Sequence, residues 1–156
     1  MERVLPNRGT SWLLAGAMLS LAAAILHLGV IAGGPDWYRF FGAPESYALA
    51  AAQGSIVPAL VAAAIAAILA IWAAFALSGA GRLIRLPLLR TALVTITAIY
   101  LARGLLLIPT FLYVPYPEGA FDYWSSAIVL IYGLVHAVGL WLAWPALTPR
   151  AHNVAG

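Results

Sequence analysis

Arg103 is the residue whose type and position suggest chemistry most directly. It lies in residues 86–109, a stretch that is otherwise almost wholly apolar. A charge at the centre of a bilayer costs from about 2.5 to more than 10 kcal/mol, so such a residue is a functional-site candidate by default. A guanidinium can bind an anionic or carbonyl group with two parallel hydrogen bonds. The alternative is a salt bridge to Glu45, Glu118 or Asp122.

Two more polar side chains are expected at nearly the same depth. Counted at 1.5 Å per residue from the expected outer ends of their helices, His27 and Arg103 each lie about 9 Å deep and Gln53 about 12 Å deep. This agreement predicts a pocket in the outer half of the membrane, in which His27 and Gln53 orient a ligand held by Arg103. Each can also be structural, with His27 bonded to a helix carbonyl and Gln53 joining two helices.

The predicted pocket extends inward through aromatic and histidine side chains. Tyr100 lies one helical turn from Arg103, while Tyr132 and His136 share one helix face. His136 is the deepest, at about 21 Å. Below it the residues are mainly apolar, which favours a pocket with a floor over a pore. The mouth is expected to be aromatic, with Trp37, Tyr123 and Trp124 as its ligand-binding candidates.

The histidines also allow two cofactor or catalytic hypotheses. In an integral-membrane enzyme, His27 or His136 would act as general base and Arg103 would stabilise developing negative charge. A haem held by both histidines is disfavoured, because their estimated depths differ by about 12 Å and one iron needs ligands at nearly equal levels. The sequence therefore leaves the cofactor unknown.

The composition defines the surroundings in which these side chains act. Of the 156 residues, 64% are apolar and 8% charged, so a soluble domain would lack the polar surface to cover itself. We expect one all-α integral membrane domain over residues 1–156. The chain has no cysteine, which excludes disulfides and thiolate metal sites, and no metal site is predicted. A net charge of +3 is too small to indicate a nucleic-acid partner.

The elements that must position these residues are four transmembrane helices. A span needs about 20 apolar residues, and breakers such as Pro35 and Pro109 separate runs of this length. Pro58 is expected to kink the second helix, and Pro109 to end the third. The helices are predicted at about 11–33, 44–77, 86–108 and 122–144, followed by a flexible tail over 148–156.

The distribution of arginine predicts the orientation of the four-helix bundle. Arginines concentrate on the cytoplasmic side of membrane proteins, and the flanks that are rich in arginine place both termini there. The two outer loops are then aromatic and acidic. The arginines assigned to the cytoplasmic side are Arg3, Arg8, Arg82, Arg85, Arg90 and Arg150. We expect a plasma (inner) membrane location.

The leading functional prediction is a small membrane protein that binds or transports a lipophilic, anionic small molecule or a lipid head group. The alternatives are an accessory or structural subunit of a larger membrane complex, and the enzyme described above. Membrane lipid is the expected partner in each case. Small residues such as Gly29 and Gly33, spaced as GxxxG, let helices approach closely and are also compatible with a homodimer.

Overall fold

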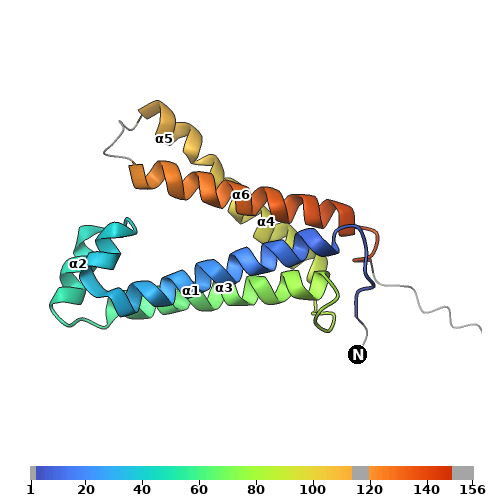
Figure 1. Cartoon of the computed structure of the whole chain (residues 1–156), viewed down its shortest axis with the longest axis horizontal. Coiled ribbons are helices and arrows are strands. Elements are labelled where there is room, and N and C mark those ends of the chain that lie inside the picture. Colours follow the sequence, from blue (N-terminus) through green and yellow to red (C-terminus); the bar gives the residue numbers. More distant parts are fainter. Residues whose placement is uncertain (1–2, 114–119, 149–156) are drawn as a thin grey trace, which may run out of the picture.

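In a computed structural model of the protein, residues 3–113 and 120–148 are described, and the regular elements in these ranges are α-helices. Glu118 and the tail from residue 149 onward lie outside the described residues. The helices are α1 (Thr10–Phe40), α2 (Glu45–Ala52), α3 (Val57–Gly79), α4 (Leu89–Leu105), α5 (Leu107–Tyr113) and α6 (Ala120–Ala143) (Figure 1).

Within the described part of the chain, four helical stretches are long and apolar enough to cross a membrane. They are α1 with 31 residues, α3 with 23, α4 continued by α5 with 25, and α6 with 24. Each exceeds the roughly 20 residues that a hydrocarbon core requires. The prediction of an all-helical bundle with four spans is confirmed.

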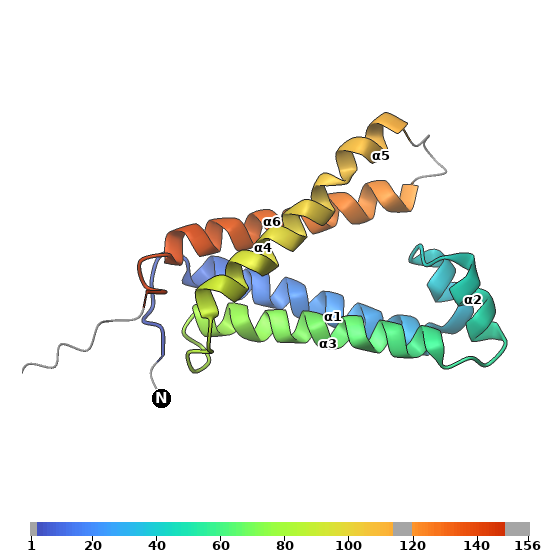
Figure 2. The ribbon, with the colours of Figure 1, turned by 180° about the vertical axis from the view of Figure 1, so that it is seen from behind.

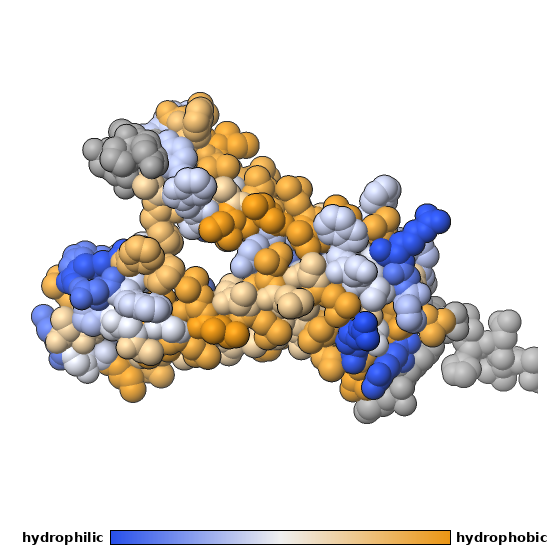
Figure 3. Space-filling view, viewed as in Figure 1, coloured by the Kyte–Doolittle hydropathy of each residue, from blue (hydrophilic) through white to orange (hydrophobic). Residues whose placement is uncertain are grey.

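The helices form two pairs, α1 with α3 and α4 with α6, which pack together at one end of the molecule and diverge at the other (Figures 1 and 2). We call the end where α1 begins and α6 ends the basal end. The end that carries α2 and α5 is the distal end. Between the diverging parts of the two pairs the space-filling view shows a hollow, which we call the cleft (Figure 3).

Small residues explain the tight basal packing. A Cβ on Gly139 of α6 would lie 3.0 Å from the backbone nitrogen of Leu13 in α1, and a Cβ on Gly9 would lie 2.3 Å from the Gly139 carbonyl oxygen. The distal core differs, because its buried apolar residues come from α1, α2 and α3 alone: Val30, Tyr38, Ala48 and Ala62. The α4–α6 pair thus contributes nothing to this buried cluster.

The prediction of one helix over 44–77 is wrong. The chain turns between α2 and α3, where Gly54 has a φ of 78°, a conformation that glycine adopts without strain. Pro58 then lies in the first turn of α3. Proline is well tolerated there, since the first N–H groups of a helix have no partner within it. Pro58 therefore helps to begin a helix instead of kinking one.

The first and third helices also differ from their predicted bounds. The helical path of α1 breaks at Gly34 (φ 68°, ψ −153°) and then continues through Pro35 to Phe40. The third helix begins at Leu89 and not at 86, because the Ser78 hydroxyl accepts a hydrogen bond from the Leu86 N–H at 3.0 Å and holds the preceding turn.

Pro109 does not end the third span. It has no N–H to donate to the carbonyl of Leu105, so the helix is interrupted at Leu106, and α5 then continues to Tyr113. The fourth helix, Ala120–Ala143, agrees with its prediction within two residues.

Candidate functional site

A layer of buried polar and aromatic side chains joins the four long helices at the base of the cleft. The hydroxyls of Ser20 in α1 and Tyr100 in α4 are hydrogen-bonded at 2.9 Å. The ring of Trp72 in α3 meets the Tyr100 ring edge-on, with centroids 5.0 Å apart, and Tyr132 in α6 lies 5.7 Å from it. Tyr100 is thus the centre of the layer.

His136 completes this layer and is fully buried. Its ring centroid lies 5.0 Å from that of Tyr100, and a Cβ on Gly16 of α1 would lie 2.8 Å from its Cε1. Its Nδ1 is 2.8 Å from the carbonyl oxygen of Tyr132, so Nδ1 carries the proton and Nε2 of the neutral ring is an acceptor. No described residue donates to Nε2. The structure therefore brings Tyr100, Tyr132 and His136 together, although behind Gly16 and away from solvent.

Arg103 lies one helical turn beyond Tyr100, toward the distal end. Its two terminal nitrogens donate to the hydroxyls of Ser126 at 2.7 Å and Ser125 at 3.3 Å, both on α6. The helices come close at this point, since a Cβ on Gly104 would lie 2.5 Å from the Cα of Leu130.

Of the three carboxylates considered as alternative partners of Arg103, Glu45 is bound elsewhere. Glu45 accepts instead from Arg39, at 2.9 Å. No carboxylate among the described residues lies within 4.0 Å of the Arg103 guanidinium, so the pairing with Asp122 is not found. Glu118 is outside the described residues. In the part of the chain that is described, two neutral hydroxyls are the partners of this charge.

The placement of Gln53 inside the membrane is also wrong. Gln53 is exposed and follows the last residue of α2, at the distal turn that leads to α3. The depth estimate assumed that residues 44–77 form one spanning helix, whereas α2 ends at Ala52 and the long helix α3 begins only at Val57. Gln53 therefore does not share a level with Arg103.

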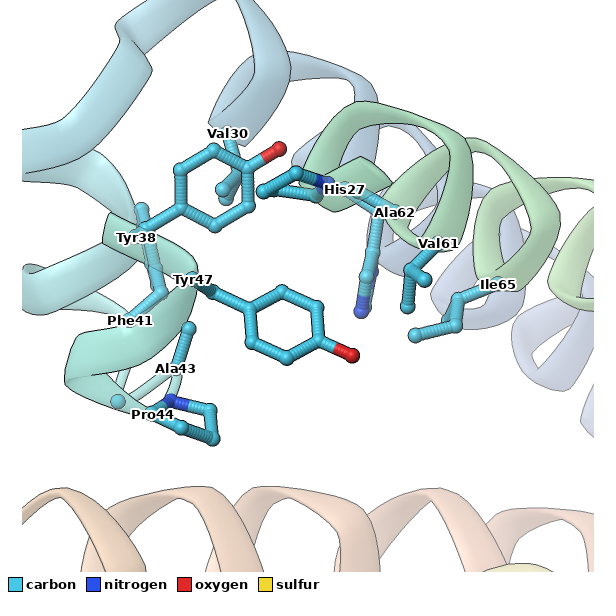
Figure 4. Close-up of a pocket in the computed structure, with 12 residues that line it drawn as sticks. His27, Val30, Tyr38, Phe41, Ala43, Pro44, Tyr47, Val61, Ala62 and Ile65 are labelled. Atoms are coloured by element: carbon cyan, nitrogen blue, oxygen red, sulfur yellow. The ribbon is translucent and has the colours of Figure 1, made fainter. Parts of the chain in front are cut away.

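His27 lines a cavity to which Arg103 does not contribute. This cavity, of about 360 Å³, lies between α1, α2 and α3 near the distal end (Figure 4). The Nδ1 of His27 is 2.8 Å from the carbonyl oxygen of Ala23, one turn earlier in the same helix. The other residues that line the cavity are Val30, Tyr38, Phe41, Gly42, Ala43, Pro44, Tyr47, Pro58, Val61, Ala62 and Ile65.

The three aromatic residues expected at the mouth come from two elements: Trp37 lies in α1, and Tyr123 and Trp124 are neighbours in α6. Trp37 folds back onto α1, where a Cβ on Gly33 would lie 2.0 Å from its Cγ; the predicted GxxxG surface is thus covered by Trp37. The Tyr123 hydroxyl is 3.3 Å from the carbonyl oxygen of Thr110, which ties α6 to α5. Trp124 is 66% exposed.

The two helix pairs leave a hollow between them that the space-filling view shows toward the distal end (Figure 3). Ser20 and Tyr100 define a common level at its base. From that level His27 lies seven residues along α1, about 10.5 Å, and Arg103 three residues along α4, about 4.5 Å. At the distal end the ring of Phe121 in α6 packs on Gly42, where an added Cβ would lie 2.1 Å from it.

Sequence reasoning missed several residues that matter here. Sequence reasoning does not single out Ser20, Trp72, Ser126 or Tyr47. The sequence did contain a signal for Ser20 and Ser126, because a serine within an apolar helix needs a hydrogen-bond partner. Which partner it takes depends on helix rotation, which the sequence pattern leaves open.

The helices and their apolar surfaces define the class: a small four-span integral membrane protein. Compared with protein-family models, with curated proteins and with solved structures, the chain matches none of them.

Proposed function

We propose that the protein binds, in the cleft between its two helix pairs, a lipophilic molecule that carries an anionic head group. The observation that carries this proposal is the environment of Arg103. Its charge lies in a membrane-spanning helix and is held in the described structure only by the neutral hydroxyls of Ser125 and Ser126. A charge in such a place is costly unless it is compensated.

The hydrogen bonds of Arg103 leave capacity for a ligand. A guanidinium has five N–H donors, and the two serines accept from two of them. Three donors therefore have no acceptor in the described part of the chain. A carboxylate or phosphate would accept from them and neutralise the charge, each such bond contributing about 1.5–3 kcal/mol.

The shape of the molecule favours an amphiphile. The two helix pairs diverge from the base (Figure 1) and leave a hollow that opens sideways (Figure 3), with the contact of Phe121 on Gly42 at its distal side. A lipid-like molecule can place its chain in the surrounding hydrocarbon while its head group enters the cleft. The apolar surfaces of α1 and α3 then contact the chain.

The experiment measures binding of oleate, a long-chain carboxylate, to the purified protein in lipid nanodiscs. Oleyl alcohol has the same chain without the charge and is the matched ligand control. We expect Arg103→Gln to weaken oleate binding by roughly 10-fold or more, the equivalent of one charge-assisted hydrogen bond, and to leave oleyl alcohol unaffected. Arg82→Gln, which removes an exposed arginine from the α3–α4 connection, is the matched protein control.

Equal oleate binding by Arg103→Gln and the unchanged protein would refute the proposal. If neither binds oleate and both purify with a larger membrane protein, the role of an accessory subunit is favoured instead. A native mass spectrum of the same samples identifies any molecule that remains bound.

We propose further that the distal end faces outward and that both termini are cytoplasmic, because arginines gather around the α3–α4 connection at the basal end. The chain has no cysteine, so single cysteines report their position without background. Asp36→Cys should react with a membrane-impermeant maleimide on intact cells, and Arg82→Cys only after the membrane is opened. The reverse pattern would invert the orientation.

A further inference from the structure

We infer that the cavity between α1, α2 and α3 is a second binding site, which takes a neutral, lipid-soluble molecule bearing a hydroxyl on a ring, such as a phenol or quinol. This site is separate from the one proposed around Arg103, which is not among the residues that line the cavity. Its volume of about 360 Å³ is within the range of ordinary small-molecule pockets, about 300–1,000 Å³.

An unpartnered buried hydroxyl marks this cavity as a ligand site. Tyr38 is 5% exposed, and no described residue hydrogen-bonds to its hydroxyl oxygen. A buried hydroxyl without a partner costs free energy, so a ligand that bonds to it gains affinity. Figure 4 shows Tyr38 and Tyr47 extending from the α1–α2 side of the cavity toward His27 and α3, with their hydroxyl ends leading.

His27 supplies the complementary group. Because its Nδ1 bonds to the carbonyl oxygen of Ala23, Nδ1 holds the proton and Nε2 of the neutral ring accepts. The cavity thus presents one acceptor, Nε2 of His27, and two hydroxyls that can donate. A ligand hydroxyl can donate to His27 and accept from a tyrosine at the same time, which a hydrocarbon cannot do.

The charges around the cavity argue for a neutral occupant. None of its lining residues is an aspartate, glutamate, lysine or arginine. The nearest charged side chains in sequence are not among the lining residues and pair with one another, since Arg39 binds Glu45 at 2.9 Å and Asp36 at 3.1 Å. The remaining lining is aliphatic and aromatic, including Val61, Ala62 and Ile65, and suits an apolar ring.

The access route is through the cleft. α6 lies on the far side of the cavity in Figure 4, across the hollow between the helix pairs. Phe121 rests on Gly42, which itself lines the cavity. A lipid-soluble molecule therefore enters sideways from the membrane, beneath this contact.

The test uses 4-hydroxybenzophenone, a neutral phenol that labels its surroundings when illuminated, with benzophenone as the analogue lacking the hydroxyl. The full chain in phosphatidylcholine nanodiscs is labelled, and empty nanodiscs correct for partition into lipid. We expect labelling to concentrate on residues 27–65. We also expect the phenol to bind several-fold more tightly than benzophenone.

Tyr38→Phe keeps the ring and removes the hydroxyl. It should weaken phenol binding by about 2- to 10-fold, the equivalent of one net hydrogen bond, and leave benzophenone binding unchanged. Tyr113→Phe, at a position that is 81% exposed, is the matched control. It should change neither phenol binding nor benzophenone binding. Ala62→Phe, which fills the cavity, should abolish site-specific labelling.

Labelling spread evenly over the four spans would overturn the inference, as would a Tyr38→Phe variant that retains the full preference for the phenol. Folding of each variant is checked by its elution as a single species and by its oleate binding. Arg103→Gln should label normally with the phenol. The two proposals can therefore fail independently.

Discussion

Adding a methyl group at Gly104 is expected to separate α4 from α6 and to loosen Arg103. A Cβ at this position would lie 2.5 Å from the Cα and 2.6 Å from the backbone nitrogen of Leu130. These atoms belong to the backbone of α6, so no side-chain rotation can relieve the contact. The helices must move apart, and the hydrogen bonds from Arg103 to the serines of α6 lengthen with them.

The magnitude follows from two opposing terms. Overpacking costs about 1–3 kcal/mol, and contact with backbone favours the upper value. Replacing glycine with alanine in a helix contributes about 1 kcal/mol of stabilisation. Gly104→Ala should therefore lower the free energy of unfolding by about 2 kcal/mol.

Gly29→Ala is the matched control. Its Cβ would lie 3.4 Å from Cζ3 of Trp37, which is ordinary contact, so the helical gain of up to about 1 kcal/mol remains. The free energies of unfolding of Gly104→Ala and Gly29→Ala should differ by about 3 kcal/mol, or roughly 100-fold in the unfolding equilibrium constant.

The assay is reversible unfolding in mixed micelles with increasing dodecyl sulfate, followed by the change in tryptophan fluorescence. If Gly104→Ala proves as stable as Gly29→Ala, then α4 and α6 do not approach at this point and the seating of Arg103 described above is incorrect. Oleate binding by the same variants shows whether the loss extends to the proposed site.

Two further predictions concern other contacts. Tyr100→Phe leaves the buried Ser20 hydroxyl without its partner, and a double-mutant cycle with Ser20→Ala should give a coupling of about 0.6–1.7 kcal/mol, as between helices in membranes; no coupling would contradict the bond. The hydrogen bonds and charge of Arg39 hold the pKa of the Glu45 carboxyl below its ordinary value. The ion pair therefore contributes a small stabilisation at pH values above the ordinary pKa of a glutamate carboxyl. This stabilisation is lost as the pH falls through the lowered pKa of Glu45. Carbon NMR titration of Glu45 should show its pKa rising in Arg39→Gln, and an unchanged value would contradict the pairing.

The residues that sequence reasoning placed correctly are those whose position depends on one helix alone. Tyr132 and His136 were expected on one helix face, and the structure places both in the layer around Tyr100. Gln53 was misplaced because one glycine, Gly54, ended a helix that apolar composition alone would have continued. An apolar run thus indicates that a segment suits the membrane without showing where its helix begins.

The sequence by itself determined the class of the protein and the number of its spans, because hydropathy and length are local properties that a hydrocarbon layer of fixed thickness selects. Only the tertiary structure decided the partners of Arg103, the burial of His136 beneath Gly16, and the separation of the His27 cavity from the Arg103 site. Those outcomes depend on how the helices rotate and cross, and hence on close contacts such as Gly104 against Leu130. Contacts of this kind join residues far apart in the chain and leave no periodic pattern along it.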